Sequence, residues 1–289
     1  MWGELACLAS AACWASASLI YRRLGKETRP MALNLLKSGL ATLLLAGTLL
    51  AVEGWRPPGW EQLGWLALSG LVGLTIGDSL YFGALTTLGP RKTLLIWSLA
   101  PALTAALAWP VLGEPVTAGM LGGMALTLGG IALVITDREG AGVGVTTKKG
   151  VLLALGATAC QAVGCVLTKL GDDGVSSLAI STIRLGAAVP VLLVLVLLAG
   201  QGSDLAKGSR PGYAGKLVAG CLVGTYAGLW LSMYGLTRID AGVAVTLSTT
   251  TPLFILPLVA LFEKERIGPR AILGALVAVG GVAVLLLAA

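Results

Sequence analysis

Three charged side chains lie well inside apolar segments of this chain: Lys37, Asp78 and Arg184. A charged residue at the centre of a membrane-spanning helix costs about 2.5–3.5 kcal/mol, so a partner, water or a bound solute must offset it. The segment around the aspartate, LVGLTIGDSLYFGAL, is otherwise almost wholly apolar. A carboxylate there can carry a proton or pair with a cation, and these three residues are therefore the first candidates for function.

Lys37 and Asp78 are predicted to face each other. Helix 30–51 and helix 61–87 run in opposite directions, and at 1.5 Å per residue both side chains lie about 6 Å to the same side of the midplane. Each residue belongs to a polar stripe of i, i+3 and i+4 spacing. The stripes are formed by Asn34, Lys37 and Ser38 and by Thr75, Asp78 and Tyr81. The pattern fits a static ion pair and also a pair that opens when a proton or substrate arrives.

Arg184 has no equivalent acidic partner. It aligns with Lys37 in an internal repeat, whereas Asp78 aligns with Leu229. Two interpretations stay open. The side chain reaches toward the acidic residues 172–173 at the membrane surface, or it lines a wet cavity and binds an anionic substrate group, because a guanidinium matches a carboxylate in geometry.

Polar and aromatic residues add candidates for a substrate cavity. The hydroxyl run TLSTTTP leads into Pro252, where freed backbone groups need partners that hydroxyls can supply. A single aromatic residue is more often a packing residue or an interfacial anchor. The further candidates are Trp14, Trp97, Ser98, Tyr226, Trp230, Ser248 and Thr249.

The composition indicates an integral membrane protein. Of 289 residues, 56% are hydrophobic and 12% charged, and the mean hydropathy is +0.89, whereas soluble domains carry about 25% charged residues. The chain has no histidine, its five cysteines all lie in apolar runs, and it has no GxxxxGK[ST] loop. The net charge of +6 lies in short loops. We therefore expect no metal, no cofactor and no nucleic-acid partner.

Ten apolar runs are long enough to cross about 30 Å of hydrocarbon. We predict an all-α membrane protein with transmembrane helices at 3–21, 30–51, 61–87, 92–111, 116–135, 150–170, 177–198, 213–236, 241–262 and 267–288. We call the side where the chain begins side A and the other side B. Side B loops hold fifteen Lys and Arg residues and side A loops hold three. The positive-inside rule places side B in the cytoplasm and both termini outside the cytoplasmic (inner) membrane.

An internal repeat relates the two halves of the chain. Residues 100–130 align with residues 251–281 at an offset of 151. The two aligned glutamates fall at turns between helices and are expected to cap helices, and the aligned glycines are expected at close helix crossings. The matches include Pro101 with Pro252, Glu114 with Glu265, and Gly73 and Gly77 with Gly224 and Gly228.

Each repeat unit contains five predicted helices, and an odd number inverts the second unit relative to the first. The units are predicted at 1–136 and 150–289, joined by a cytoplasmic linker at 137–149. The fold class is therefore ten transmembrane helices in two inverted five-helix repeats. In transporters, such repeats place a binding site near the midplane and alternate access by rocking.

The segments that close the two repeats resemble the EamA branch of the drug/metabolite transporter superfamily. They begin at GALTTLGPRKTLLIW and YGLTRIDAGVAVTLS, and the opening LACLASAACWASASLIYRR with Trp14 is similar to the family's first helix. The resemblance covers nearly the whole chain. It implies a ten-helix carrier of small metabolites, often an exporter. Family members usually keep both termini in the cytoplasm, whereas the charge bias of this chain predicts the reverse.

These observations favour a secondary active transporter, not an enzyme. The expected cargo is a small polar metabolite, an amino acid or another zwitterionic or anionic compound, and the expected direction is export. The alternative is a multidrug-type organic cation/proton antiporter, although the first helix of each half lacks a carboxylate. A membrane enzyme is less well supported. The expected partners are the small-molecule substrate, the lipid bilayer and protons, in a monomer or homodimer.

Overall fold

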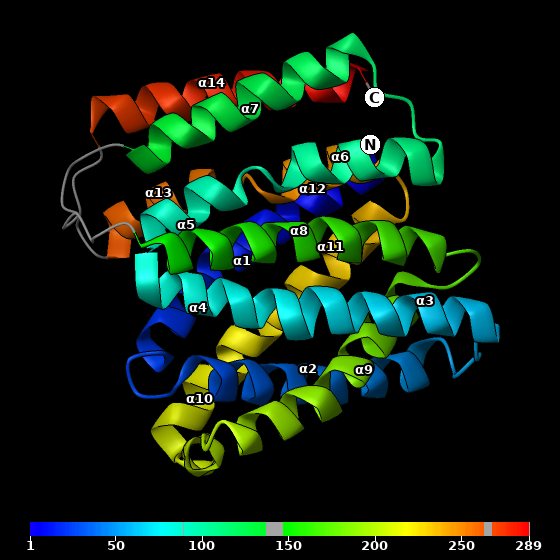
Figure 1. Cartoon of the computed structure of the whole chain (residues 1–289), viewed down its shortest axis with the longest axis vertical. Coiled ribbons are helices and arrows are strands. Elements are labelled where there is room, and N and C mark those ends of the chain that lie inside the picture. Colours follow the sequence, from blue (N-terminus) through cyan, green and yellow to red (C-terminus); the bar gives the residue numbers. More distant parts are fainter. Residues whose placement is uncertain (89, 137–146, 263–267, 289) are drawn as a thin grey trace.

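The computed structural model is a bundle of helices that run roughly along one direction (Figure 1). It describes residues 1–88, 90–136, 147–262 and 268–288, and it contains no strand within these ranges. The start of α1 and the end of α14 lie at the same end of the bundle (Figure 1). The elements of the first half are α1 (Trp2–Leu24), α2 (Pro30–Val52), α3 (Trp60–Gly70), the π-helix η1 (Leu71–Gly77), α4 (Asp78–Leu88), α5 (Pro90–Trp97), α6 (Ala100–Leu112) and α7 (Ala118–Thr136).

The second half repeats this order with one added short helix. Its elements are α8 (Lys148–Leu170), α9 (Ser177–Leu198), the 3₁₀-helix η2 (Gly202–Ser209), α10 (Pro211–Gly220), the π-helix η3 (Cys221–Gly228), α11 (Leu229–Leu236), α12 (Ala241–Ser248), α13 (Thr251–Phe262) and α14 (Pro269–Ala288). Glu265 and most of the predicted linker 137–149 lie outside the described residues.

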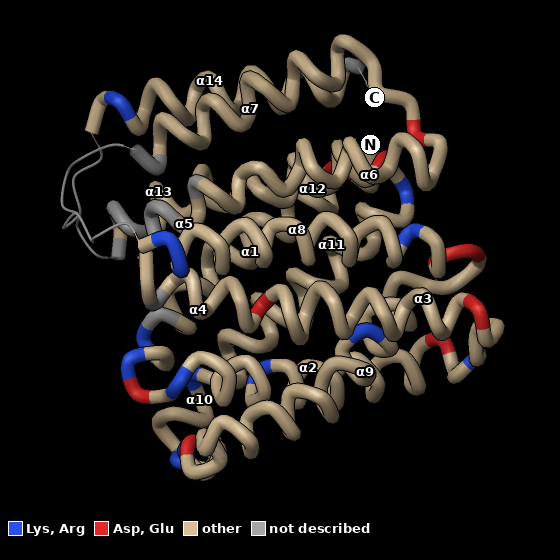
Figure 2. Tube along the Cα trace, viewed as in Figure 1, with Lys and Arg blue, Asp and Glu red and all other residues tan. Residues whose placement is uncertain are grey.

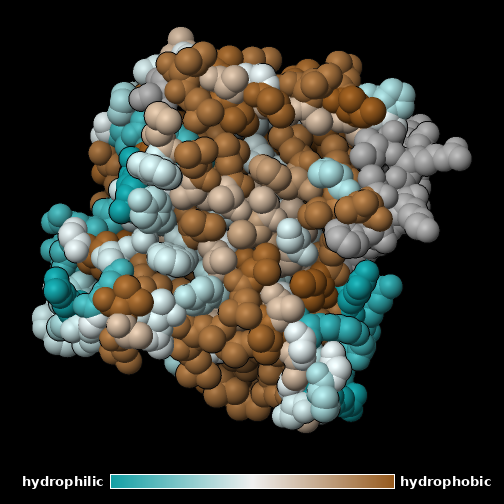
Figure 3. Space-filling view, turned by 180° about the vertical axis from the view of Figure 1, so that it is seen from behind, coloured by the Kyte–Doolittle hydropathy of each residue, from teal (hydrophilic) through white to brown (hydrophobic). Residues whose placement is uncertain are grey.

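Eight helical stretches among the described residues are long and apolar enough to cross a membrane. The shorter apolar helices Ala100–Leu112 and Ala118–Val134 occupy the places predicted for the fourth and fifth spans. The two-repeat layout fits these elements. Charged residues gather at the two ends of the bundle (Figure 2), and a broad apolar surface lies between hydrophilic ends (Figure 3).

Two predicted helices are each divided in the structure. The fourth breaks between α5 and α6, and the ninth breaks between α12 and α13. Pro101 and Pro252 each stand in the first turn of the helix after the break, where proline is best accommodated because it has no N–H to donate to the preceding turn. Pro252 cannot donate to the Ser248 carbonyl four residues earlier, and the hydroxyl of Thr251 donates to that carbonyl instead at 3.1 Å. The expected hydroxyl partners for the freed backbone are therefore confirmed at the second break.

The two π-helices occupy equivalent places in the two halves. η1 holds Gly73 and Gly77, and η3 holds Gly224 and Gly228. π-helical turns are rare and occur often at functional sites. The sequence predicted an ordinary α-helix in both places. In the first half the π-helix η1 ends directly before Asp78.

The halves pack on each other through these segments. α3 and η1 lie against α8 and α9, and η3 and α11 lie against α1, in an inverted arrangement. A Cβ placed on Gly224 would lie 2.5 Å from the Ala17 Cβ, and one on Gly228 would lie 3.1 Å from Trp14 Nε1. Such close approaches need glycine, so the predicted crossings are confirmed.

α7 and α14 form a separate close pair at one edge of the bundle (Figure 1). Glycines on both helices allow the backbones to touch. A Cβ on Gly130 would lie 2.5 Å from the Gly274 carbonyl oxygen, and one on Gly281 would lie 2.8 Å from the Gly123 carbonyl oxygen. The last helix of each half is therefore fixed to its repeat mate.

Candidate functional site

A buried ion pair joins α2 to the start of α4. Lys37 Nζ lies 3.4 Å from Asp78 Oδ2, and the two side chains are 6% and 25% exposed. The predicted pairing of these residues is confirmed. Because Asp78 is the first residue after η1, the π-helix sets the direction in which its carboxylate points.

Neighbouring polar and aromatic groups frame this pair. Asn34 Nδ2 donates to the Leu74 carbonyl of η1 at 3.3 Å, and thereby satisfies a backbone acceptor of the π-helix. One turn after Asp78, Tyr81 meets Trp97 of α5 edge to face, with ring centroids 4.8 Å apart. The structure thus brings five of the predicted candidates into one region, namely Asn34, Lys37, Asp78, Tyr81 and Trp97.

Arg184 on α9 is buried, and within the described residues it forms no ion pair with an acid. Its side chain lies over the backbone of η1, since a Cβ on Gly73 would lie 3.2 Å from Arg184 Nη2. Nη1 donates to the Met233 thioether at 2.6 Å, and Nε finds no hydrogen-bond acceptor among the described residues. The residue is 2% exposed. It interacts electrostatically with Asp78 over a longer distance. The interpretation that it reaches toward residues 172–173 is not supported by these contacts.

The two cations lie at equivalent helix crossings. The carbonyl of Lys37 accepts from the Cys221 thiol at 3.5 Å, and the carbonyl of Arg184 touches Gly70. Cys221 and Gly70 are themselves 151 residues apart, the offset of the repeat. The crossings are related by the repeat, whereas the partners of the side chains differ.

The aromatic candidates of the second half connect helices to one another. Tyr226 and Thr48 share a hydrogen bond between hydroxyls of 2.8 Å, and Trp230 Nε1 donates to the Ser177 hydroxyl at 3.2 Å. Trp14 packs on Gly228 in η3. Such contacts fix the position of η3 and α11 against α1, α2 and α9. They belong to different helix pairs from the contact between α2 and α4.

The hydroxyl candidates near the helix breaks are turned toward local partners. Thr249 Oγ1 donates to the Thr246 carbonyl at 2.8 Å. Ser248 lies near Cys7 of α1, and Ser98 is buried directly after α5. The printed contacts of Thr249 and Ser248 are thus with other groups than the ion pair.

A group that we call the side A clasp joins the two halves at one end. Glu114 Oε2 accepts from the backbone N–H of Ala241 at 2.7 Å, and Glu114 Oε1 lies 3.0 Å from Lys169 Nζ. A carboxylate at the first N–H groups of a helix stabilises its start. The predicted capping role of Glu114 is confirmed, and the helix that it caps is α12 of the other half.

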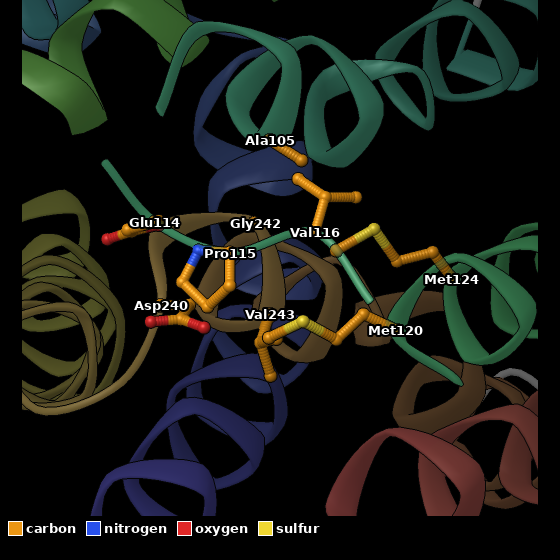
Figure 4. Close-up of a pocket in the computed structure, with 9 residues that line it drawn as sticks. All are labelled: Ala105, Glu114, Pro115, Val116, Met120, Met124, Asp240, Gly242 and Val243. Atoms are coloured by element: carbon orange, nitrogen blue, oxygen red, sulfur yellow. The ribbon is translucent and has the colours of Figure 1, made fainter. Parts of the chain in front are cut away.

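The pocket beside this clasp is small and largely apolar (Figure 4). Met120 and Met124 reach into it from α7, while the carboxylate of Glu114 points away from their sulfur atoms (Figure 4). Its lining gives a polar solute few partners. The pocket is formed by Ala105, Glu114, Pro115, Val116, Met120, Met124, Asp240, Gly242 and Val243.

A second group, the side B clasp, joins the halves at the opposite end. Asp204 Oδ2 accepts from the backbone N–H of Arg29 at 2.9 Å and from its Nε at 3.0 Å, and Oδ1 lies 2.8 Å from Lys207 Nζ. Lys207 and then the amide and guanidinium of Arg29 hold the pKa of Asp204 well below its usual range. Sequence reasoning did not identify Asp204, although a lone aspartate in a basic loop was an available signal.

Among the described residues, no group of three or more His, Cys, Asp or Glu side chains could hold a metal ion. The charged and polar side chains at the centre of the bundle can form ion pairs, bind a proton and form hydrogen bonds.

Comparison with known proteins gives a family and a fold. The model of the EamA-like transporter family matches residues 1–136 and 148–287. A solved structure described only as "Crystal structure of protein" is similar, with a TM-score of 0.79, 20% sequence identity and coverage of 99% of this chain and 97% of that chain. In all, 29 solved chains match. A comparison with curated proteins found no match. At this identity the solved structure shows the fold alone.

Proposed function

Because the chain belongs to the EamA-like transporter family, and is thus a multi-pass membrane protein, we propose that it is a secondary active transporter that exports a small polar metabolite. The cargo is an amino acid or another zwitterionic or anionic compound. It moves by alternating access between the two repeats.

The observation that carries this proposal is the charge arrangement at the centre of the bundle. Lys37 and Asp78 form a pair, and Arg184 adds a second cation that is buried. With all three ionised, these groups sum to one net positive charge. Ionisable residues at this depth mark substrate and ion pathways. A net positive site attracts an anionic or zwitterionic solute and disfavours a lipophilic cation.

The two clasps support alternating access. Each joins the first half to the second, one at side A through Glu114 and one at side B through Asp204. If one opens while the other holds, the centre of the bundle is exposed to one side at a time. Both are closed in this structure, which fits an intermediate in which the site is shielded from both sides.

The proposed setting follows from the loop charges. Side B, with its Lys and Arg residues, faces the cytoplasm, and both termini lie outside the cytoplasmic membrane. Protons are the proposed coupling ion, because Asp78 can exchange its bond to Lys37 for a proton. The functional unit is a monomer or homodimer.

The alternative is an organic cation/proton antiporter. The edge-to-face pair of Tyr81 and Trp97, one turn from Asp78, favours it, because aromatic faces and a carboxylate attract cations. For such a cargo, Lys37 must leave the carboxylate before the cation can bind. The two buried cations make this the weaker candidate.

Transport by purified protein in proteoliposomes tests the proposal. A panel of amino acids, organic acids and organic cations is offered with and without a pH gradient. We expect pH-dependent movement of a zwitterion or an anion, and its loss in Asp78→Asn. The matched control is Asp173→Asn, which removes a carboxylate from an exposed loop position. Movement of organic cations alone would favour the alternative.

A further inference from the structure

We propose that Arg184 is a carboxylate-binding subsite, and that it selects solutes with one net negative charge. The inference rests on the proposed transport function for its assumption that the bound solute is the cargo. It goes further by naming the residue that binds the cargo and the charge that the cargo carries.

The first step is the state of the guanidinium. Arg184 is 2% exposed, yet within the described residues Nε has no acceptor and Nη1 donates to the Met233 sulfur. A thioether is a weak acceptor. A buried cation with an open donor is costly unless a ligand satisfies it. The guanidinium is thus buried in the bundle with its Nε donor able to bind an acceptor from a solute.

The second step is the repeat. Lys37 and Arg184 start from equivalent crossings, and Lys37 reaches an acid on the helix that contains η1. In the second half Leu229 stands where the first half has Asp78, and Arg184 contacts Met233, which lies one turn after Leu229. The first half thus has a carboxylate that pairs with Lys37, whereas the second half has no carboxylate at the equivalent position. A solute carboxylate can take that place.

The third step is access to the guanidinium. The Gly73 backbone packs close to Arg184 Nη2, and a Cβ at this position would lie only 3.2 Å from it, so a larger residue here would crowd the guanidinium. Met233 is flexible and can turn away from Nη1 when a stronger acceptor arrives. Nε and an Nη group then present the two parallel donors that bind a carboxylate at both oxygens.

The fourth step is charge balance. A carboxylate on Arg184 brings the sum over Lys37, Asp78 and Arg184 to zero. The ammonium group of a zwitterion would need an acid of its own, and Asp78 is occupied by Lys37. Within the described residues, no other acid lies well inside the spans. A monocarboxylate without an ammonium group therefore fits this arrangement best.

The first experiment needs no ligand. Arg184→Met removes the open cation and keeps a long side chain, so the melting temperature of the purified protein should stay the same or rise. Arg56→Met at an exposed loop position is the matched control. A fall of several degrees in Arg184→Met and also in Arg184→Gln would show that the arginine is a structural anchor, and would overturn the proposal.

The second experiment uses defined probes. Acetate, pyruvate, 4-methyl-2-oxopentanoate and phenylacetate are each compared with the corresponding amide, and the two oxo acids also with alanine and leucine, by thermal stabilisation at high concentration. We expect the acids to stabilise the wild type and Arg56→Met. Arg184→Gln should bind them about tenfold to a hundredfold more weakly, because a hydrogen bond to a charged group is lost.

The outcomes separate the subsite from transport. Equal effects of acids and amides across the series, or tighter binding of the amino acids than of the oxo acids, would overturn the proposal. Carboxylate binding that depends on Arg184 without movement in proteoliposomes would keep the subsite and refute the transport function. Normal transport of the cargo by Arg184→Gln would keep the transport function and refute the subsite.

Discussion

Lys37 Nζ and Asp78 Oδ2 lie 3.4 Å apart on two helices of the same repeat, and the Lys37 side chain is only 6% exposed. Removing one charge therefore leaves the other buried alone. We expect Asp78→Asn to lower the free energy of unfolding by about 3–5 kcal/mol, the usual cost of breaking a buried pair. Thermal unfolding of purified protein measures this change.

A double variant separates stability from function. Lys37→Met with Asp78→Leu removes both charges and should recover most of the melting temperature, because apolar residues of similar volume often replace a buried pair without loss. Transport should stay abolished. Recovery of pH-dependent transport in the double variant would reduce the pair to a static contact.

Gly70 is predicted to be intolerant of even one added methyl group. A Cβ there would overlap the carbonyl of Arg184, which is backbone and cannot turn away. We expect Gly70→Ala to cost about 1–3 kcal/mol or more through overpacking. Gly64 on the same helix faces open space, so Gly64→Ala should be neutral or slightly stabilising. Equal melting temperatures for the two variants would contradict the close contact between Gly70 and the Arg184 carbonyl.

Glu114 should stabilise the folded protein, because its carboxylate accepts a hydrogen bond at the start of α12. Glu114→Gln weakens the bond to the Ala241 N–H and removes the ion pair with Lys169, and we expect a loss of about 1 kcal/mol. Glu27→Gln is the control, because its side chain is exposed at a loop. Hydrogen exchange at the first turn of α12 should rise in the first variant only.

The side B clasp should respond to acid. The folded-state pKa of Asp204 lies below its unfolded value of about 3.9, so its contribution to stability is full above that value. The contribution is lost as pH falls from about 4 through the folded pKa. Asp204→Asn should therefore lower the melting temperature at pH 7, and the difference from wild type should shrink below about pH 4. A difference that is constant with pH would contradict the role of the carboxylate.

The orientation is testable with reporters. Reporter fusions at Ala289 should read as extracytoplasmic, because the Lys and Arg residues of side B favour the cytoplasm. A fusion at Met1 should give the same reading, since the start of α1 and the end of α14 lie at one end of the bundle (Figure 1). A cytoplasmic signal at either terminus would refute the proposed topology.

Sequence patterns predicted the all-helical bundle and the Lys37–Asp78 contact for clear reasons. The length of an apolar segment determines whether it can span a membrane. Two opposite charges at the same depth on neighbouring helices pair because an unpaired charge in the membrane is costly. The glycine matches predicted where backbones touch, because only glycine permits such distances.

Other features depend on three-dimensional contacts that a single sequence does not contain. Nothing in LVGLTIG distinguishes a π-helix from an ordinary helix. Lys169 lies in the last turn of α8 and Asp204 lies in the short helix η2, and the partners that join them to the first half come from distant parts of the chain. The contact of Arg184 with Met233 depends on how α9 and α11 cross, so the sequence could offer only alternatives for the guanidinium.

The unequal partners of Lys37 and Arg184 also constrain how this chain can be divided or duplicated. A dimer of two first halves would have two lysine–aspartate pairs and no free guanidinium. A dimer of two second halves would have two buried arginines and no central acid. Neither arrangement reproduces the centre of this protein, so its three buried charges require one copy of each half in the same molecule.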